Sequence, residues 1–306
     1  MTGPGMSAFS HQSWWRPGVM SLMLCWNLPA AELPNLLDIP PDLTIPTVSD
    51  GPPAAGRRVA FTPPGWEGKG PAGFLYLPPE WNPGGSLPLI VEFPGNGDYH
   101  NALGDFSSGL PEDCQLGYGM SGGMGSLWLC LPYLERSPQG KGDRWQVAKH
   151  WWGDRAATRQ YCLDAVRAVC RDLGGDGQRV LLAGFSRGAI GVHYLGLQDD
   201  EIASLWAAFL CHSHYDGVRS WGQPGDDAAS ARIRLARRGT RPEWISHEGT
   251  VAATRAYLEA TGESLEGMTL VALPFPNHNA GWVLRDLPER RQLRAWYATV
   301  IAPRKP

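Results

Sequence analysis

The chain has 306 residues, of which 43% are hydrophobic and 19% charged, a globular composition that excludes a disordered or fibrous protein. The formal net charge of −3 gives no indication of a nucleic-acid partner, which would require a concentrated basic face. The 38 glycines and 27 prolines predict many turns, and the 14 tryptophans can pack in a core or stack on flat ligands.

The N-terminal residues differ from the rest of the chain. Arg16 precedes the apolar stretch Pro17–Ala31, so residues 1–31 are predicted to be a secretory signal peptide, with a disordered tail or a misplaced start codon as the alternative. Residues 32–56 are rich in proline and are predicted to form a linker or extended arm. We therefore expect a secreted or periplasmic protein, or otherwise a cytoplasmic one, in which residues 57–306 form a single domain.

Short apolar runs mark the expected strands. The first two flank the glycine-rich "GWEGKG" and predict a hairpin. The later runs are continuously apolar, which is typical of strands buried on both faces of a parallel sheet. The strands are expected within residues 57–63, 72–78, 87–93, 126–133, 179–184, 204–211, 242–248 and 269–275.

Helical patterns fill the gaps between these runs. Residues 158–176 place apolar side chains three and four apart, and Gly174 predicts the end of that helix. Residues 250–262 end similarly at a glycine, and residues 281–301 form a last amphipathic segment. Alternating strands and helices predict a wound α/β domain, with a mostly parallel central sheet flanked by helices.

The pattern G-x-S-x-G occurs twice. "GMSGG", around Ser121, precedes a strand and follows a polar loop, so that serine is interpreted as a turn residue. "GFSRG", around Ser186, follows a strand and opens a helix, which is the context of a nucleophile elbow. Gly184 and Gly188 leave room for close backbone approach, and the amide of Arg187 would bind a developing oxyanion at the helix N-terminus.

With "AGFSRGA", a "PGNG" turn after an earlier strand and a late histidine, residues 57–303 resemble the α/β-hydrolase superfamily. The resemblance implies the α/β-hydrolase fold and the chain order nucleophile, acid, histidine. His278 lies in the loop after the last expected strand, where the resemblance places the catalytic histidine. His193 closely follows the serine, and three histidines farther downstream, His212, His214 and His247, also precede that strand.

The acid of the triad is left between two residues. Glu248 follows the penultimate strand, 30 residues before His278, and Asp216 follows the strand before it. Either carboxylate would hold the imidazole tautomer through the second ring nitrogen. The second oxyanion donor is expected after residues 87–93, where Pro94-Gly95 replaces the usual His-Gly and makes the amide of Asn96 the candidate.

Other motifs allow a structural or a functional interpretation. "HSHYDG" is interpreted as a hydrogen-bonded rim beside the triad, with a metal site as the alternative. "HWWGD" supplies a tryptophan that either packs on the sheet or forms the base of an acyl or sugar pocket. His212 and Trp152 are the candidate substrate-binding residues from these motifs. The arginine-rich residues 231–241 predict a solvated helix face, or else attraction of an anionic polymer.

The six cysteines do not define a disulfide framework. Cys130 and Cys211 lie in apolar runs and are expected to be buried thiols. Cys162 and Cys170 lie about 12 Å apart along one helix, too far to bridge each other, whereas Cys114 could pair with one of them. No C-x-x-C occurs, which argues against a structural zinc site.

The candidate triad of Ser186, His278 and Glu248 or Asp216 predicts a serine hydrolase that cleaves carboxylic esters through an acyl-enzyme, with no cofactor and no metal. The substrate is expected to be a small-molecule or polymeric ester, and the predicted export and the tryptophans favour polysaccharide-linked or polyester substrates. A peptidase or amidase on the same triad is one alternative. A non-catalytic member of the fold that binds a glycan in a tryptophan-lined cleft is the other.

Overall fold

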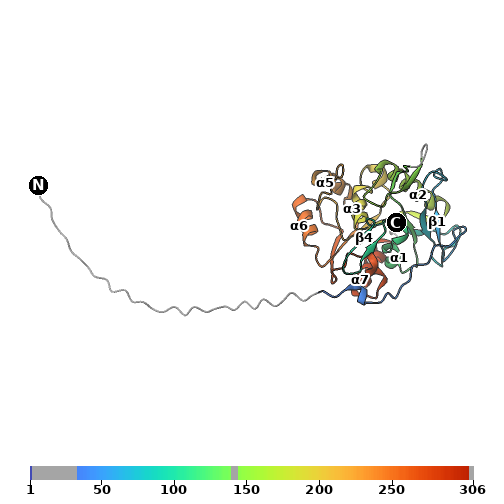
Figure 1. Cartoon of the computed structure of the whole chain (residues 1–306), viewed down its shortest axis with the longest axis horizontal. Helices are drawn as coiled ribbons and strands as arrows, with labels where there is room; N and C mark the ends of the chain where they lie inside the picture. The colour runs from blue at the N-terminus through green and yellow to red at the C-terminus, as the bar shows by residue number, and fades with distance from the viewer. Residues whose placement is uncertain (2–32, 139–143, 303–306) are drawn as a thin grey trace. The chain divides into compact units, whose positions relative to one another are not determined.

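The computed structural model describes Met1, residues 33–138 and residues 144–302 (Figure 1). The predicted signal peptide, residues 1–31, therefore lies outside the described residues except for Met1. The main sheet has eight strands in the order β1-β2-β6-β3-β9-β10-β11-β12. These strands are β1 (Arg58–Phe61), β2 (Gly73–Tyr76), β3 (Leu87–Phe93), β6 (Leu127–Cys130), β9 (Gly175–Phe185), β10 (Ala208–His212), β11 (Glu243–Glu248) and β12 (Met268–Leu273).

The strand directions confirm the predicted fold class. β1 and β2 form the expected antiparallel hairpin, and β2 also runs antiparallel to β6. From β6 to β12 all neighbours are parallel. Because the carboxyl ends of parallel strands meet at one edge, the loops after β3, β9, β10, β11 and β12 lie together there.

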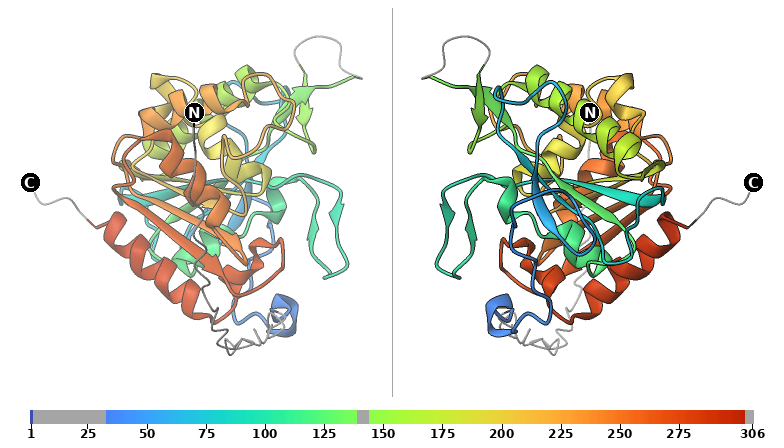
Figure 2. Two further views of the ribbon diagram at one scale, coloured as in Figure 1. Left: turned by 90° about the vertical axis from the view of Figure 1, so that its left-hand side faces the viewer. Right: turned by 90° about the vertical axis from the view of Figure 1, so that its right-hand side faces the viewer.

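Helices cover both faces of the sheet, as Figure 2 shows for the C-terminal helix α7 in red. Successive side chains of β3 alternate between two cores: Leu89 and Val91 belong to one and Ile90 to the other. The first core is completed by α2 (Arg155–Asp172), α3 (Arg187–Tyr194), α4 (Asp200–Ala203), α5 (Ala228–Arg238) and α6 (Ala252–Thr261). The second is completed by α1 (Leu116–Ser121) and α7 (Pro288–Val300).

The last amphipathic segment, expected over residues 281–301, divides into two elements. A 3-10 helix, η3 (Ala280–Leu284), is followed by a break, and α7 then begins at Pro288. Proline fits the first turn of a helix because its missing N–H would have no intrahelical partner there. The break gives the chain after His278 room to turn before α7 crosses the sheet.

Residues 33–56, within the predicted linker or arm, run along the surface of the sheet domain. They contain a 3-10 helix, η1 (Leu36–Asp38), whose first residue is buried and whose first amide donates to Oδ1 of Asn277 at 2.7 Å. Farther along, Asp42 forms an ion pair of 2.6 Å with Arg290 of α7. The arm is thus held against the domain by a buried side chain and by polar contacts.

Two small hairpins extend beyond the main sheet and were not expected from the sequence (Figure 2). One pairs β4 (Tyr99–His100) with β5 (Phe106–Ser107), and the other pairs β7 (Leu134–Arg136) with β8 (Trp145–Val147). Strands of two or three residues are too short to show a period-2 pattern. A third 3-10 helix, η2 (Pro111–Asp113), follows the first hairpin.

Two expectations about charged and sulfur-containing side chains are wrong. In the arginine-rich segment, α5 buries two arginines: Arg234 pairs with Asp216 at 2.6 Å, and Arg238 lies 3.6 Å from Glu243. The arginines of α5 therefore do not all face solvent, because the buried carboxylates of Asp216 and Glu243 require cationic partners. Among the described cysteines all thiols are free, so Cys114 makes no disulfide.

Within the described residues, no helix combines the length and the apolar character needed to cross a membrane.

Candidate active site

Ser186 occupies a strained turn between β9 and α3. Its φ of 54° and ψ of −116° lie in a region that non-glycine residues rarely adopt. A Cβ at Gly184 would lie 2.1 Å from the carbonyl oxygen of Gly188, and one at Gly188 would lie 2.2 Å from that of Phe93. The flanking glycines are therefore required by close backbone approach, which holds the serine at the sheet edge.

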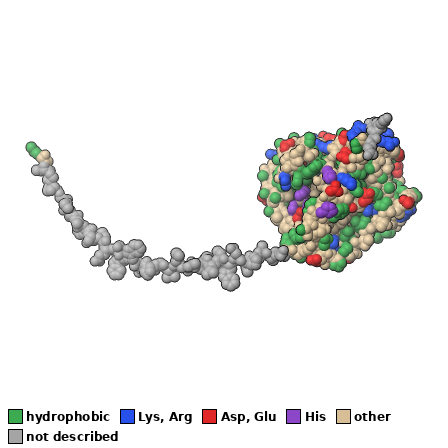
Figure 3. Space-filling model, viewed as in Figure 1, with side chains coloured by type: hydrophobic (Ala, Val, Ile, Leu, Met, Phe, Trp, Pro, Cys, Tyr) green, Lys and Arg blue, Asp and Glu red, His purple; other side chains and the backbone are tan. Residues whose placement is uncertain are grey.

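Three of the predicted site residues lie side by side. His278, in the loop after β12, places Nε2 2.8 Å from Oγ of Ser186. Its Nδ1 lies 2.7 Å from Oε1 of Glu248, the last residue of β11. Figure 3 shows histidine side chains gathering near the middle of the face of the sheet domain viewed there. The arrangement lets an imidazole accept a proton from the serine while its second nitrogen donates to a carboxylate.

Glu248 is held in its charged form. Burial disfavours the carboxylate, but the hydrogen bond from His278 and the positive potential of nearby imidazoles outweigh it and lower the pKa of Glu248 to about 2. The hydroxyl of Ser213 donates to Oε2 at 2.7 Å, from a backbone with φ of 79°. Both oxygens of Glu248 therefore have hydrogen-bond partners, which fixes the carboxylate beside the imidazole.

Asp216, the alternative acid, lies elsewhere. Its two oxygens accept hydrogen bonds from Arg234 at 2.6 and 3.0 Å, and its side chain is fully buried. Glu248 reaches His278 because β11 is the neighbour of β12, whereas the chain after β10 turns toward α5. Asp216 is thus part of a buried ion pair rather than of the site.

Asp105, which sequence reasoning missed, positions the loop that carries His278. Oδ2 of Asp105 accepts from the amide of His278 at 2.9 Å. Its Oδ1 accepts from the side-chain amides of Asn277 at 2.9 Å and Asn279 at 3.1 Å. Tyr99, from the same hairpin, places its ring 5.1 Å from that of His278. The two asparagines that flank His278 were the available signal, since such side chains need a polar partner.

The amides predicted to bind the oxyanion, those of Asn96 and Arg187, are unpaired within the described part of the chain. The loop after β3 is held in place by the loop that follows β8. The amide of Gly97 donates to the carbonyl of Lys149 at 2.7 Å, and the amide of Trp151 donates to Oδ1 of Asn96 at 2.7 Å. Two free amides on rigid backbone can stabilise a negative charge that develops between them.

The side chain of Arg187 connects these loops. Its buried guanidinium donates to the carbonyls of Ala148 at 2.9 Å, Trp151 at 2.5 Å and Gly109 at 3.1 Å. It also lies 4.5 Å from the centre of the Tyr133 ring. The residue next to Ser186 therefore fixes the loop that in turn holds Asn96.

The two candidate substrate-binding residues are buried behind the site. Trp152 is 2% exposed, and its indole donates to the carbonyl of Arg187 at 3.2 Å. His212 is 0% exposed, with Nδ1 3.1 Å from Oγ of Ser246 and Nε2 3.1 Å from the carbonyl of Asn279. Both expectations are wrong, because Trp152 packs against the backbone of Arg187 and His212 holds the loop that carries Asn279.

Acid is expected to destabilise the protein through buried His212 and half-buried His214. Burial lowers the pKa of His212 and of His214 from 6.5 to about 4. Between these values the unfolded chain binds more protons than the folded one, so stability falls as pH falls from about 6.5 to about 4. Each histidine contributes up to about 1.4 kcal/mol per pH unit. Calorimetric Tm values from pH 7.5 to 4.5 should show this slope, and His214→Gln should reduce it; an unchanged slope would contradict the assignment.

The histidines and the aspartate of "HSHYDG" do not converge on a metal site. The described residues contain one group with metal-ligand spacing, His193, Cys211 and Glu243, whose ligand atoms lie within 4.8 Å of one another. Glu243 already contacts His193 at 2.8 Å, Tyr215 at 3.1 Å and the guanidinium of Arg238 at 3.6 Å. This group is interpreted as a buried ion-pair network.

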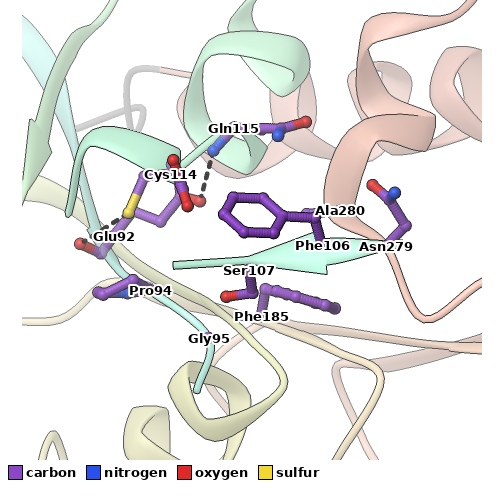
Figure 4. Close-up of a pocket in the computed structure, with 11 residues that line it drawn as sticks. Glu92, Pro94, Gly95, Phe106, Ser107, Cys114, Gln115, Phe185, Asn279 and Ala280 are labelled. Carbon is purple, nitrogen blue, oxygen red and sulfur yellow. Dashed lines mark hydrogen bonds between the residues drawn. The ribbon is translucent and has the colours of Figure 1, made fainter. Parts of the chain in front are cut away.

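A small cavity of about 80 Å³ lies beside the loop after β3, with Gly95, Phe185 and Asn279 on its walls (Figure 4). Glu92 borders it and accepts backbone hydrogen bonds at 2.8 to 3.0 Å from the first turn of α1, at Gln115 and the two residues after it. The loop that carries Asn96 therefore borders this cavity through Pro94 and Gly95.

The structure is similar to solved esterase structures. Esterase 2 of Thermogutta terrifontis phosphorylated by paraoxon is 18% identical, with a TM-score of 0.50, over 76% of this chain and 91% of that chain. The apo form of the same esterase is 19% identical, with the same TM-score and coverage. No protein-family profile and no curated protein sequence matches this chain. Its sheet order, its strand–turn–helix around Ser186 and these similarities show that the chain has the α/β-hydrolase fold.

Proposed function

We propose that the protein is a serine hydrolase that cleaves carboxylic esters. The observation that carries the proposal is the continuous hydrogen-bonded series from Oγ of Ser186 through His278 to Glu248, beside two unpaired amides. Nucleophile, base and orienting carboxylate in this geometry are the requirements for acyl transfer. The name esterase of the similar Thermogutta terrifontis protein agrees with this class of reaction.

In the proposed mechanism, Oγ of Ser186 attacks the ester carbonyl carbon while Nε2 of His278 takes the hydroxyl proton. The carbonyl oxygen becomes an oxyanion and is stabilised by the amides of Arg187 and Asn96. His278 then gives the proton to the leaving alkoxide, which departs as the alcohol and leaves an acyl-serine. Water, deprotonated by His278, attacks this acyl-enzyme, and His278 returns that proton to Oγ of Ser186 as the carboxylic acid leaves. Glu248 stays ionised throughout and stabilises the imidazolium.

The export of the protein and its preference for polymeric ester substrates are also proposals. We propose that the protein is secreted or periplasmic, because residues 1–31 have the pattern of a signal peptide. An exported esterase would meet polysaccharide-linked or polyester substrates. Expression of the full chain with detection of the mature N-terminus tests the export.

Labelling with a fluorophosphonate probe tests the serine assignment directly. We expect one phosphonyl group per chain, on Ser186, since the probe reacts with serines activated by a neighbouring base. The label should be absent in Ser186→Ala and in wild-type protein pretreated with paraoxon, the reagent present in the similar esterase structure. A wild-type protein that is neither labelled nor active on p-nitrophenyl esters would be the non-catalytic glycan-binding alternative.

A further inference from the structure

A second cavity, of about 200 Å³, opens beside the triad and has no role in the mechanism above. Its walls come from the chain after β10, from the end of β11 and from α6, and they include the rings of His214, Trp221 and His247. The ring of His214 lies 5.2 Å from that of His278 and 5.2 Å from that of Trp221. The cavity therefore adjoins the catalytic base.

The same cavity adjoins the oxyanion loop. The ring of Trp221 lies 5.5 Å from that of Trp151, whose amide holds the side chain of Asn96. A carbonyl carbon bonded to Oγ of Ser186 would lie near His278, and two walls of the cavity, His214 and Trp221, contact His278 and Trp151. One of the two groups of an ester substrate can extend into the cavity.

The group that the cavity receives is on the alcohol side of the ester. The leaving oxygen must accept its proton from Nε2 of His278, so the alcohol moiety lies on the side of that imidazole. His214 contacts His278 and forms a wall of the cavity. An alcohol moiety that departs past His278 would therefore extend along His214 into the cavity.

The chemistry of the walls favours a flat group with a negative charge. Burial lowers the pKa of His214 to about 4, so its imidazole is neutral at pH 7 and offers an uncharged flat wall. Val218 and Ala253 add aliphatic surface. Arg219 lines the cavity, is exposed and lies 4.4 Å from the Trp221 ring centre, and no carboxylate among the described residues forms an ion pair with it.

We propose that this aryl cavity, formed by His214, Val218, Arg219, Trp221, His247 and Ala253, binds an aromatic alcohol moiety that carries a carboxylate. The ring packs against the indole and imidazole faces, and the guanidinium of Arg219 donates charge-assisted hydrogen bonds to the carboxylate. The favoured substrates are therefore esters of hydroxybenzoate-like alcohols. This inference rests on the proposed esterase activity.

Two esters with the same acetyl group test the charge preference. 3-Acetoxybenzoate carries the carboxylate, and 3-acetoxybenzamide is its neutral counterpart of nearly equal shape. We expect wild-type protein to favour the carboxylate ester, and Arg219→Gln to lower kcat/KM for it about tenfold, as expected for one charged hydrogen bond, with less than about twofold change for the amide. Arg255→Gln, an exposed arginine of α6 outside the cavity walls, is the matched control.

Pre-steady-state kinetics test which side of the ester the cavity holds. Both esters form the same acetyl-enzyme, so Arg219→Gln should change the rate of acylation and leave the rate of deacylation unchanged. A changed deacylation rate would show that the cavity holds the acyl group and would overturn the assignment to the alcohol.

A substitution in the cavity wall gives an independent measurement. Ala253 is exposed on α6, so Ala253→Phe should fold and should narrow the cavity. We expect kcat/KM to fall about tenfold for both aryl esters and to stay constant for methyl acetate, whose alcohol does not reach the cavity. Ala252→Phe, at the neighbouring exposed position outside the cavity walls, should have no effect.

The outcomes separate the inference from the proposed function. Equal effects of Arg219→Gln on the two esters, the same effect from Arg255→Gln, or no wild-type preference for the carboxylate would overturn the inference while ester cleavage still stood. Failure of wild-type protein to cleave either ester, together with absence of the fluorophosphonate label, would overturn both.

Discussion

Replacing Ser186 with alanine is expected to lower kcat for p-nitrophenyl acetate by about 10⁵-fold, because the acyl-enzyme can no longer form. The fold should survive, since the lost hydroxyl has one hydrogen-bond partner within the described residues, Nε2 of His278. Initial rates measured against active-site-titrated wild-type protein, with circular dichroism to verify folding, check the result. Residual activity should come only from the oxyanion amides and substrate binding.

The chain offers a matched control for this variant in its second G-x-S-x-G. Ser121 is the last residue of α1, and its hydroxyl donates to the carbonyl of Gly117 at 2.9 Å. Ser121→Ala should therefore leave kcat within about twofold of wild type, since its hydroxyl bonds are local. If Ser186→Ala kept more than a tenth of wild-type kcat, the triad assignment would be wrong.

Replacing Glu248 with glutamine is expected to lower kcat by about 10³- to 10⁴-fold. Glutamine keeps the size of the side chain but cannot stabilise the imidazolium, and its amide can favour the wrong tautomer of His278. Binding of a substrate analogue should change little, because Glu248 contacts the imidazole rather than the substrate. The measurement is kcat across the pH range, together with fluorophosphonate labelling rates that report the nucleophilicity of Ser186.

Asp216→Asn separates the two acids that the sequence left open. It should leave kcat nearly unchanged but lower the free energy of unfolding by about 3 kcal/mol, because Arg234 would remain buried without its anionic partner. Denaturant unfolding measures the stability, and p-nitrophenyl acetate turnover measures the activity. The opposite pattern, with activity lost in Asp216→Asn and kept in Glu248→Gln, would exchange the two roles.

Much of the fold was predictable because its strands are continuous apolar runs. β3 was expected over Leu87–Phe93 and has those bounds, and β11 ends at Glu248 as expected. The elbow was recognisable because a strand, two glycines around a serine and a helix follow one another within a few residues. Elements that depend on short-range pattern are thus visible in the sequence.

The expectations that were wrong concern side chains whose partners are distant in the chain. The motifs around Trp152 and His212 predict substrate contacts, yet both side chains are buried and support the loops around Ser186 and His278. Asp105 was not singled out at all, although it holds the loop of His278 from 173 residues away. The sequence does not show whether a carboxylate or an aromatic ring faces solvent or a buried amide. Only the packing of the folded chain distinguishes an exposed side chain from a buried one.

The sequence by itself determined where the eight strands of the main sheet follow one another along the chain, the turn that carries Ser186 and the short list of its candidate partners. Only the tertiary structure shows that Glu248 rather than Asp216 contacts His278, because β11 lies next to β12 while the chain after β10 turns to Arg234. It also decided which amides stay free beside the serine, since that depends on loops fixed by the side chain of Arg187. Local pattern specifies elements, whereas neighbours across the sheet and desolvation of buried charges specify the site.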